Sequence, residues 1–213
     1  MLHPTKITRE KPLTKEKPEP DRKGTIEKLI ALLKSDNLNY RWKAAEILGN
    51  IQATEAVEPL IESLSDNYVD VAWIAAKSLG KLGDKRATMP LIDCLDSKEK
   101  WLRKGAATGL GMLKDKRAVE PLIRLLDDKK PKVRVAAIKA LINIGDERAE
   151  DPITRCLQDR NKKVKAEAVI ALTKFGGEAA LNALKDSLSD PDIKEQVKMA
   201  IKRIESNRAQ KEV

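Results

Sequence analysis

The feature that most constrains the fold is an internal repeat of about 31 residues, a period typical of repeat arrays in which each copy is one supersecondary unit. Prolines recur at this spacing, at Pro59, Pro90, Pro121 and Pro152. Two leucine rows share it, Leu33, Leu64, Leu95, Leu126, Leu157 and Leu188 in one and Leu48, Leu79, Leu110, Leu141 and Leu172 in the other. We therefore predict six copies, which begin near residues 26, 57, 88, 119, 150 and 181.

Each copy is expected to form two helices, A and B. In the fourth copy Pro121 lies in the first turn of helix A, where the missing N–H has no intrahelical partner to lose. The polar run 127–130 forms a turn, and helix B then begins near Pro131. Its core row is expected at Val133, Ala137 and Leu141. Gly145 is predicted to end helix B in the left-handed conformation, as are Gly83 and Gly176 in other copies.

The composition favours helices over a sheet. Hydrophobic residues make up 41% of the chain but aromatic residues only 3%, while charged residues reach 35%. This mixture suits close-packed helices. Since one helix pair cannot bury its own apolar face, neighbouring pairs must stack. We predict an all-α protein, a right-handed α-solenoid over residues 25–210.

The N-terminal segment 1–24 differs from the array. It contains four of the ten prolines, seven basic and four acidic residues, and few apolar ones. A segment that buries so little apolar surface cannot offset the entropy of ordering. We predict that residues 1–24 form a disordered basic tail. The chain lacks an apolar run of transmembrane length and a signal-peptide pattern, so we expect a cytoplasmic protein without membrane contact.

Three segments in and just before the fourth repeat resemble a known family. The run 115–123 (DKRAVEPLI), the run 133–137 (VRVAA) and residues 141–145 are similar to the short HEAT-like repeat of the phycobilisome lyase type. The resemblance implies an armadillo-like helical solenoid whose B helices line a concave groove. Such repeats occur in scaffolds and in bilin lyases, so a bilin-lyase-type subunit is one functional alternative that the resemblance implies.

The residues themselves argue against catalysis. The single histidine, His3, lies near the N-terminus, and the sequence has no CxxC motif, His–Glu pair or glycine-rich phosphate loop. We therefore expect no enzyme activity, no catalytic or metal-ligating residues and no cofactor. Cys94 and Cys156 stand two repeats apart, about 20 Å at the usual helix spacing, which is too far for a disulfide. Both are expected to be small core residues.

Two charged rows follow the repeat. Aspartates recur after helix A, and basic residues recur early in helix B. The aspartates are Asp66, Asp128, Asp159 and Asp190, and the basic residues are Arg41, Arg103, Arg134 and Lys165. We predict a ladder of charge-assisted hydrogen bonds between neighbouring copies, with exposed rungs worth under about 1 kcal/mol each.

The tryptophans are the candidate binding residues. Trp42 and Trp73 are equivalent positions, and Trp101 lies one turn before Lys104, the next residue of the same row. This row lies about 200° from the core row around helix B, which predicts that the indoles face the groove. The alternative is that Trp42 and Trp73 pack on each other and stiffen the array. The same face is predicted to carry Lys77, Lys104, Lys132, Lys139, Lys163, Lys174 and Lys194.

Two functions from different classes follow. The first is a non-enzymatic protein-interaction scaffold that binds a protein or an acidic, partly apolar peptide in the groove, with the three tryptophans as anchors and the lysines as steering charges. The second is nucleic-acid binding, which the net charge of +9 permits. The sequence leaves the partner and the oligomeric state open.

Overall fold

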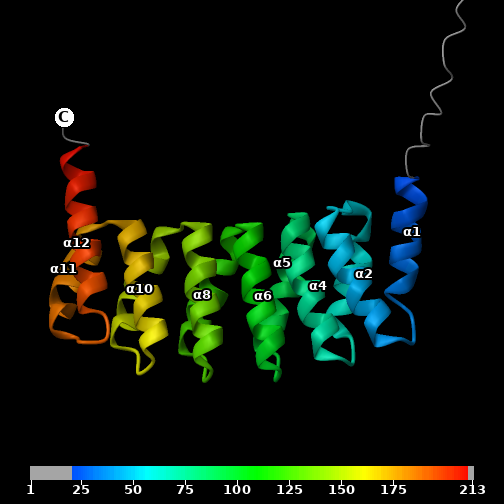
Figure 1. The fold of residues 1–213 in the computed structure, drawn as a ribbon, viewed down its shortest axis with the longest axis horizontal. Helices are drawn as coiled ribbons and strands as arrows, with labels where there is room; N and C mark the ends of the chain where they lie inside the picture. The colour runs from blue at the N-terminus through cyan, green and yellow to red at the C-terminus, as the bar shows by residue number, and fades with distance from the viewer. Residues whose placement is uncertain (1–20, 211–213) are drawn as a thin grey trace, which may run out of the picture.

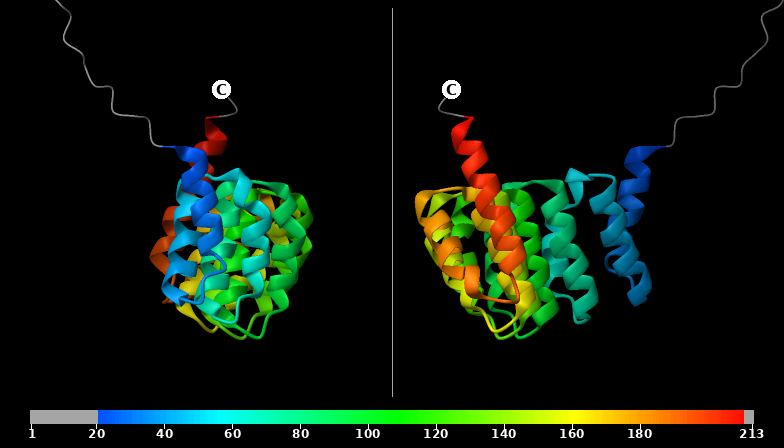
Figure 2. Two further views of the ribbon diagram at one scale, coloured as in Figure 1. Left: turned by 90° about the vertical axis from the view of Figure 1, so that its right-hand side faces the viewer. Right: turned by 60° about the vertical axis from the view of Figure 1, so that its left-hand side comes forward.

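The computed structural model describes residues 21–210, which form six consecutive helix pairs stacked along one axis (Figure 1). The A helices are α1 (Arg22–Leu32), α3 (Val57–Glu62), α5 (Thr88–Asp93), α7 (Val119–Arg124), α9 (Glu150–Arg155) and α11 (Glu178–Asp186). The B helices are α2 (Leu38–Asn50), α4 (Val69–Leu82), α6 (Lys100–Leu113), α8 (Pro131–Ile144), α10 (Lys162–Phe175) and α12 (Lys194–Ala209). The all-α solenoid of six helical hairpins is confirmed, and Figure 2 (left) looks along the stack.

Short 3-10 turns extend most A helices. Four precede them, η1 (Thr54–Ala56), η3 (Lys85–Ala87), η5 (Lys116–Ala118) and η7 (Glu147–Ala149). Five follow them, η2 (Ser63–Ser65), η4 (Cys94–Asp96), η6 (Leu125–Asp127), η8 (Cys156–Gln158) and η9 (Ser187–Ser189). Proline is the third residue of α3, α5, α7 and α9, within the first turn as predicted.

The array begins slightly earlier than predicted. Helix α1 starts at Arg22, not at residue 25, because the Asp21 carboxylate caps it and accepts a hydrogen bond of 3.0 Å from the backbone N–H of Gly24. The remaining part of the predicted tail, residues 1–20, lies outside the described residues. At the other end, α12 stops at Ala209.

The ends of the B helices follow the glycine pattern. Gly83, Gly145 and Gly176 take left-handed φ values of 73°, 71° and 69°, as predicted. In α6 the equivalent residue is Lys114, which adopts the same conformation at φ 53° without being glycine. The core also follows the predicted rows, since Leu48, Leu79, Leu110, Leu141 and Leu172 are completely buried.

Glycines bring neighbouring B helices into backbone contact. A Cβ at Gly80 of α4 would lie 2.6 Å from the Cα of Gly109 in α6, and one at Gly111 of α6 would lie 2.7 Å from the Cα of Ala140 in α8. The equivalent Gly49 of α2 faces Ser78 of α4. Gly49, Gly80 and Gly111 occupy the same position in successive copies and share one structural cause, which is the close approach of successive B helices.

The charged ladder is confirmed. Its rungs join Arg41 to Asp66, Arg103 to Asp128, Arg134 to Asp159 and Lys165 to Asp190, with shortest N–O distances of 2.6–2.7 Å. The rungs are less exposed than expected, because their side chains are only 6–16% accessible. The hydrogen bond from Lys165 lowers the pKa of Asp190.

One rung of the ladder is missing. Between the second and third copies, the basic position is Ala72 and the acidic position is Ser97. Both charges are replaced together, so neither is left without its partner. Like its neighbours, this junction has a close approach of B helices, here between Gly80 and Gly109, but it has no rung beside it.

The cysteines and the membrane prediction can be checked over residues 21–210. Both cysteines are free thiols; Cys156 is buried as expected, whereas Cys94, at the equivalent position, is only half-buried and packs against the core. Burial raises the pKa of both thiols to about 11. No helix in this part of the chain is long and apolar enough to span a bilayer.

Candidate functional site

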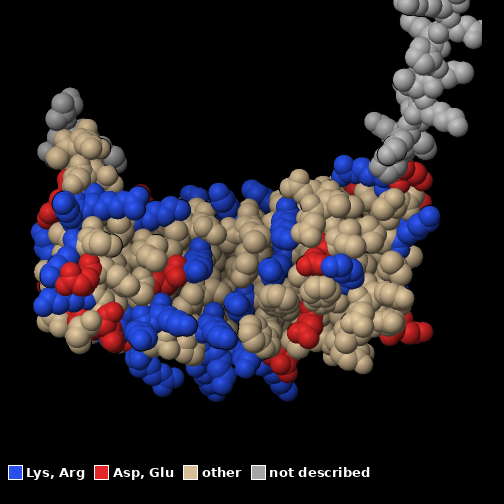
Figure 3. Space-filling model, in the orientation of Figure 1, with Lys and Arg blue, Asp and Glu red and all other residues tan. Residues whose placement is uncertain are grey.

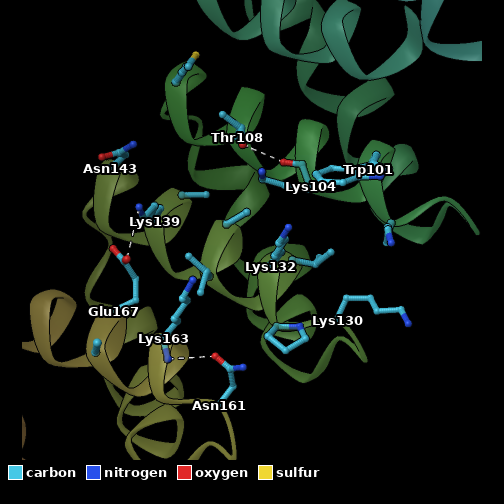
Figure 4. A pocket seen from close by; sticks show the side chains of 18 residues that line it. Trp101, Lys104, Thr108, Lys130, Lys132, Lys139, Asn143, Asn161, Lys163 and Glu167 are labelled. Carbon is cyan, nitrogen blue, oxygen red and sulfur yellow. Dashed lines mark hydrogen bonds and ion pairs between the residues drawn. The ribbon is translucent and has the colours of Figure 1, made fainter. Parts of the chain in front are cut away.

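A hollow of about 950 Å³ opens over α6, α8 and α10 (Figure 4). Five of the eight predicted binding residues line it, namely Trp101, Lys104, Lys132, Lys139 and Lys163. Trp42, Trp73 and Lys77 lie outside it. The volume is within the range of pockets that hold a small ligand or a short chain segment.

The floor of the hollow is apolar and made of small side chains. Val135, Ala136 and Ala140 of α8 and Ala166 of α10 contribute to its lining, and Met112 of α6 lies at its edge with 40% of its surface exposed. Because alanine occupies these helix positions, the surface is recessed between the longer lysine side chains. An apolar group of a partner would be desolvated there.

The walls of the hollow are strongly basic. Lys100, Lys104, Lys130, Lys132, Lys139 and Lys163 line it, whereas Glu167 is its one acidic residue. Glu167 pairs with Lys139 at 3.4 Å. Among the described residues, the other five lysines form no ion pair. Their charges are therefore available to an anionic partner.

Lys104 is affected most by this arrangement. Burial lowers its pKa, and the charges of Lys132, Lys77 and Lys139 lower it further. When a carboxylate or phosphate approaches such a lysine, its negative charge stabilises the protonated form that the neighbouring lysines disfavour. The hollow is thus electrostatically prepared for an anion.

Trp101 lies among these lysines. Its ring centroid is 5.6 Å from the Nζ of Lys100, 5.2 Å from that of Lys104 and 5.4 Å from that of Lys132. Figure 4 shows the indole beside Lys104 at one end of the hollow. These distances are within the range of cation–π contacts. The ring therefore helps to hold ammonium groups from two helices together.

Trp42 and Trp73 have a different environment. Both are half-buried and pack against the core, which the angle around an isolated helix did not predict. A Cβ at Gly105 of α6 would lie only 2.7 Å from the Cδ1 atom of Trp73, so this glycine makes room for the indole. Lys77 lies over the ring of Trp73 at 4.5 Å. Trp73 thus packs between α4 and α6 and beneath the long side chain of Lys77, whereas the predicted contact between Trp42 and Trp73 stays a prediction.

The three A–B turns next to the hollow form what we call the basic edge. It consists of Lys98, Lys100, Lys129, Lys130, Lys132, Arg160, Lys162 and Lys163. All eight side chains are exposed, and within the described part of the chain none forms an ion pair. Glu99 is the one acidic residue within the ranges 98–100, 129–132 and 160–163. Figure 3 shows the basic side chains gathered below α6, α8 and α10.

Sequence reasoning missed the basic edge as a unit. The net charge of +9 is a property of the whole chain, and three short turns contribute too few residues to stand out in it. Aligned by the repeat, the turns of the third, fourth and fifth copies are basic, whereas those of the first, second and sixth contain Asp36, Asp70 and Asp192. The comparison of repeat positions was the signal that would have found it.

The basic edge does not stabilise the helices that carry it. The N-terminus of a helix has a partial positive charge, so lysines in the first turn are unfavourable there. Helices α6, α8 and α10 have no acidic residue in the first turn, whereas α4 and α12 have Asp70 and Glu195. A cationic cluster that opposes helix stability is consistent with a role in binding.

Residues 21–210 offer no group of three or more His, Cys, Asp and Glu side chains that could hold a metal ion. The predicted Lys174 and Lys194 do not line the hollow. Lys174 donates to the backbone carbonyl of Ile142 at 3.2 Å, and Lys194 begins α12 beyond the hollow.

Similar solved structures are repeat proteins. The complex of CpcE and CpcF of phycocyanin lyase from Nostoc sp. PCC7120 is 24% identical, with a TM-score of 0.62, over 94% of this chain and 100% of that chain. An engineered protein is 23% identical, with a TM-score of 0.63, over 85% and 98%. A designed armadillo repeat protein in complex with the peptide (KR)4 is 19% identical, with a TM-score of 0.60, over 85% and 98%.

These identities establish the fold alone, so the bilin-lyase alternative stays a prediction. No curated protein matches the sequence. A family model for HEAT repeats matches residues 26–108, 88–152 and 130–203. Together these segments cover most of the chain and agree with the period, the helix pairs and the ladder. The chain therefore belongs to the HEAT-repeat family.

Proposed function

We propose that this protein is a non-enzymatic cytoplasmic scaffold whose hollow captures an acidic, partly apolar surface or peptide of a protein partner. The observation that carries the proposal is the cluster of lysines around an apolar floor, five of which have no ion-pair partner within residues 21–210. Trp101 is the anchor, because it is the tryptophan that lines the hollow. Lys104, Lys132 and Lys163 steer and hold the acidic groups.

The positive charge of the hollow indicates that the bound part of the partner is negatively charged. A solenoid is suited to binding an extended surface of another protein, and the similar designed armadillo protein is in complex with a basic peptide. Here the hollow is lined with lysines, so the partner should be acidic. Its apolar groups would contact Trp101 and the alanines of α8.

The test is a titration with a labelled peptide of glutamate, aspartate and leucine, followed by fluorescence anisotropy. Trp101→Ala should weaken binding at least about tenfold, the cost typical of a buried aromatic anchor. Trp42→Ala is the control, since it removes a half-buried indole that lies outside the hollow, and circular dichroism checks that both variants are folded. If the peptide does not bind, or if both variants bind it as the wild type does, the proposal is wrong.

Nucleic-acid binding is the second candidate, and the basic edge is the observation that favours it. Phosphate contacts would make the affinity fall steeply with salt. However, the edge contains one arginine among eight basic residues, and the hollow offers one aromatic ring. Proteins that bind single strands usually stack several bases on aromatic side chains. Retention of an oligonucleotide in preference to the acidic peptide would favour this candidate.

A further inference from the structure

We infer that the partner segment is an acidic peptide in the polyproline II conformation, with a carboxylate at every third residue so that one carboxylate meets each turn of the basic edge. This inference rests on the proposed function and specifies the partner of the same site. It follows from the spacing of the turns, the distribution of the cations and the surface between them.

The spacing is set by the repeat. Successive packed helices stand about 8–10 Å apart, so the turns that precede α6, α8 and α10 present their cations at that interval. A polyproline II chain has three residues per turn and rises about 3.1 Å per residue. Side chains three residues apart therefore point the same way and lie about 9 Å apart.

Other conformations match less well. In an extended strand, side chains on one face are two residues apart, at about 6.6 Å, which is shorter than the interval between the turns. In an α-helix, the matching side chains would be seven residues apart, at about 10.5 Å. This spacing is slightly longer than the interval between the turns, and only one residue in seven of the helix would meet a turn.

The cations are distributed evenly over the three turns. The first turn contains Lys98 and Lys100. The second turn contains Lys129, Lys130 and Lys132, and the third turn contains Arg160, Lys162 and Lys163. Each carboxylate would thus meet at least two cations that have no ion-pair partner among the described residues. The chain's own residues 1–20 do not fit, because their five basic side chains outnumber three acidic ones.

The hollow also suits the residues between the carboxylates. Polyproline II ligands dock on aromatic side chains with their proline rings and lose little entropy on binding. Trp101 and Pro131 flank the basic edge and line the hollow, next to the apolar floor of α8. Proline or other apolar residues would occupy this surface while the carboxylates meet the turns.

The experiment compares two labelled peptides of identical composition, with the full chain at low salt. One has three Glu-Pro-Pro triplets, and the other has three consecutive glutamates followed by six prolines. We expect the triplet peptide to bind at least about fivefold tighter, since exposed ion pairs contribute modestly but all three turns are engaged. Equal net charge removes non-specific attraction from the comparison.

A pair of variants locates the effect. The first variant removes the cations of the middle turn and should abolish the preference for the triplet peptide. It combines Lys129→Gln, Lys130→Gln and Lys132→Gln. The control variant changes the net charge by the same amount at exposed lysines away from the edge, and it should keep the preference for the triplet peptide. It combines Lys23→Gln, Lys28→Gln and Lys85→Gln. Circular dichroism establishes that both variants are folded.

The outcomes separate this inference from the proposed function. If both peptides bind with equal affinity, the inferred spacing of one carboxylate every third residue is wrong, but the scaffold proposal is unaffected. Failure to bind any acidic peptide overturns both. Tighter binding of a nine-nucleotide thymidine strand, or of a helical peptide with glutamates seven residues apart, overturns the inference as well.

Discussion

The rung between Arg134 and Asp159 provides the sharpest test of how the array is held together. The guanidinium donates to both oxygens of the Asp159 carboxylate at 2.6–2.7 Å and to the backbone carbonyl of Asp128 at 2.7 Å. The side chains of Arg134 and Asp159 are only 6% and 11% exposed. Loss of one partner therefore leaves the other charge largely out of water, which is more costly than the loss of a surface pair.

We expect Arg134→Met to cost about 2–3 kcal/mol of unfolding free energy, less than the roughly 3–5 kcal/mol that follows when a fully buried pair is broken. The value here is lower because Asp159 keeps some solvent and accepts a hydrogen bond from the backbone N–H of Asn161 at 2.7 Å. Methionine retains most of the aliphatic packing of the arginine stem.

Urea unfolding of Arg134→Met, Asp159→Asn and the double variant measures the coupling. The double variant should be more stable than the sum of the single costs predicts, by about 1–2 kcal/mol. Lys198→Met is the matched control, because Lys198 pairs with Glu195 at an exposed site and should cost under about 0.5 kcal/mol. If Arg134→Met costs no more than Lys198→Met, the ladder does not stabilise the stack.

Three further predictions concern single positions. Gly109→Ala should destabilise the protein by about 1–3 kcal/mol in thermal unfolding, because the new Cβ would lie 2.5 Å from the backbone oxygen of Ala76; a neutral effect would contradict the close approach. The hydrogen bond from Arg148 lowers the pKa of Asp146 to about 2, so its stabilising effect is present above pH 4 and is lost as the pH falls through 2; Asp146→Asn should converge with the wild type in urea titrations at that pH. Lys104→Met should raise the Tm by about 1–2 °C at pH 7, because the lowered pKa of Lys104 means that its charge opposes folding, and this gain should vanish above pH 10.5.

The fold was predictable because it depends on short-range periodicity. The leucine rows, the helix-ending glycines and the charged ladder all follow the same repeat period, so several independent patterns indicated the same unit. The start of α1 was missed because the composition of the tail was extended to Gly24, whereas one side chain, Asp21, decides where the helix begins.

The candidate site was only partly predictable. The helical angle placed Trp42, Trp73 and Trp101 on one face, but their burial depends on what the neighbouring helix presents. Gly105 of α6 lets Trp73 pack into the junction, whereas Trp101 lies beside lysines of α6 and α8. An angle computed on one helix carries no information about the helix next to it.

The missing rung has a consequence for shortening or rearranging the chain. Removal of residues 119–149 would bring Arg103 opposite Asp159, so the charges on both sides of the new boundary would still match. Removal of residues 88–118 would instead set Ala72 against Asp128, whose carboxylate would then have no cation. The copies are therefore not interchangeable modules. Removal of the fourth copy keeps every ladder charge paired, whereas removal of the third copy does not.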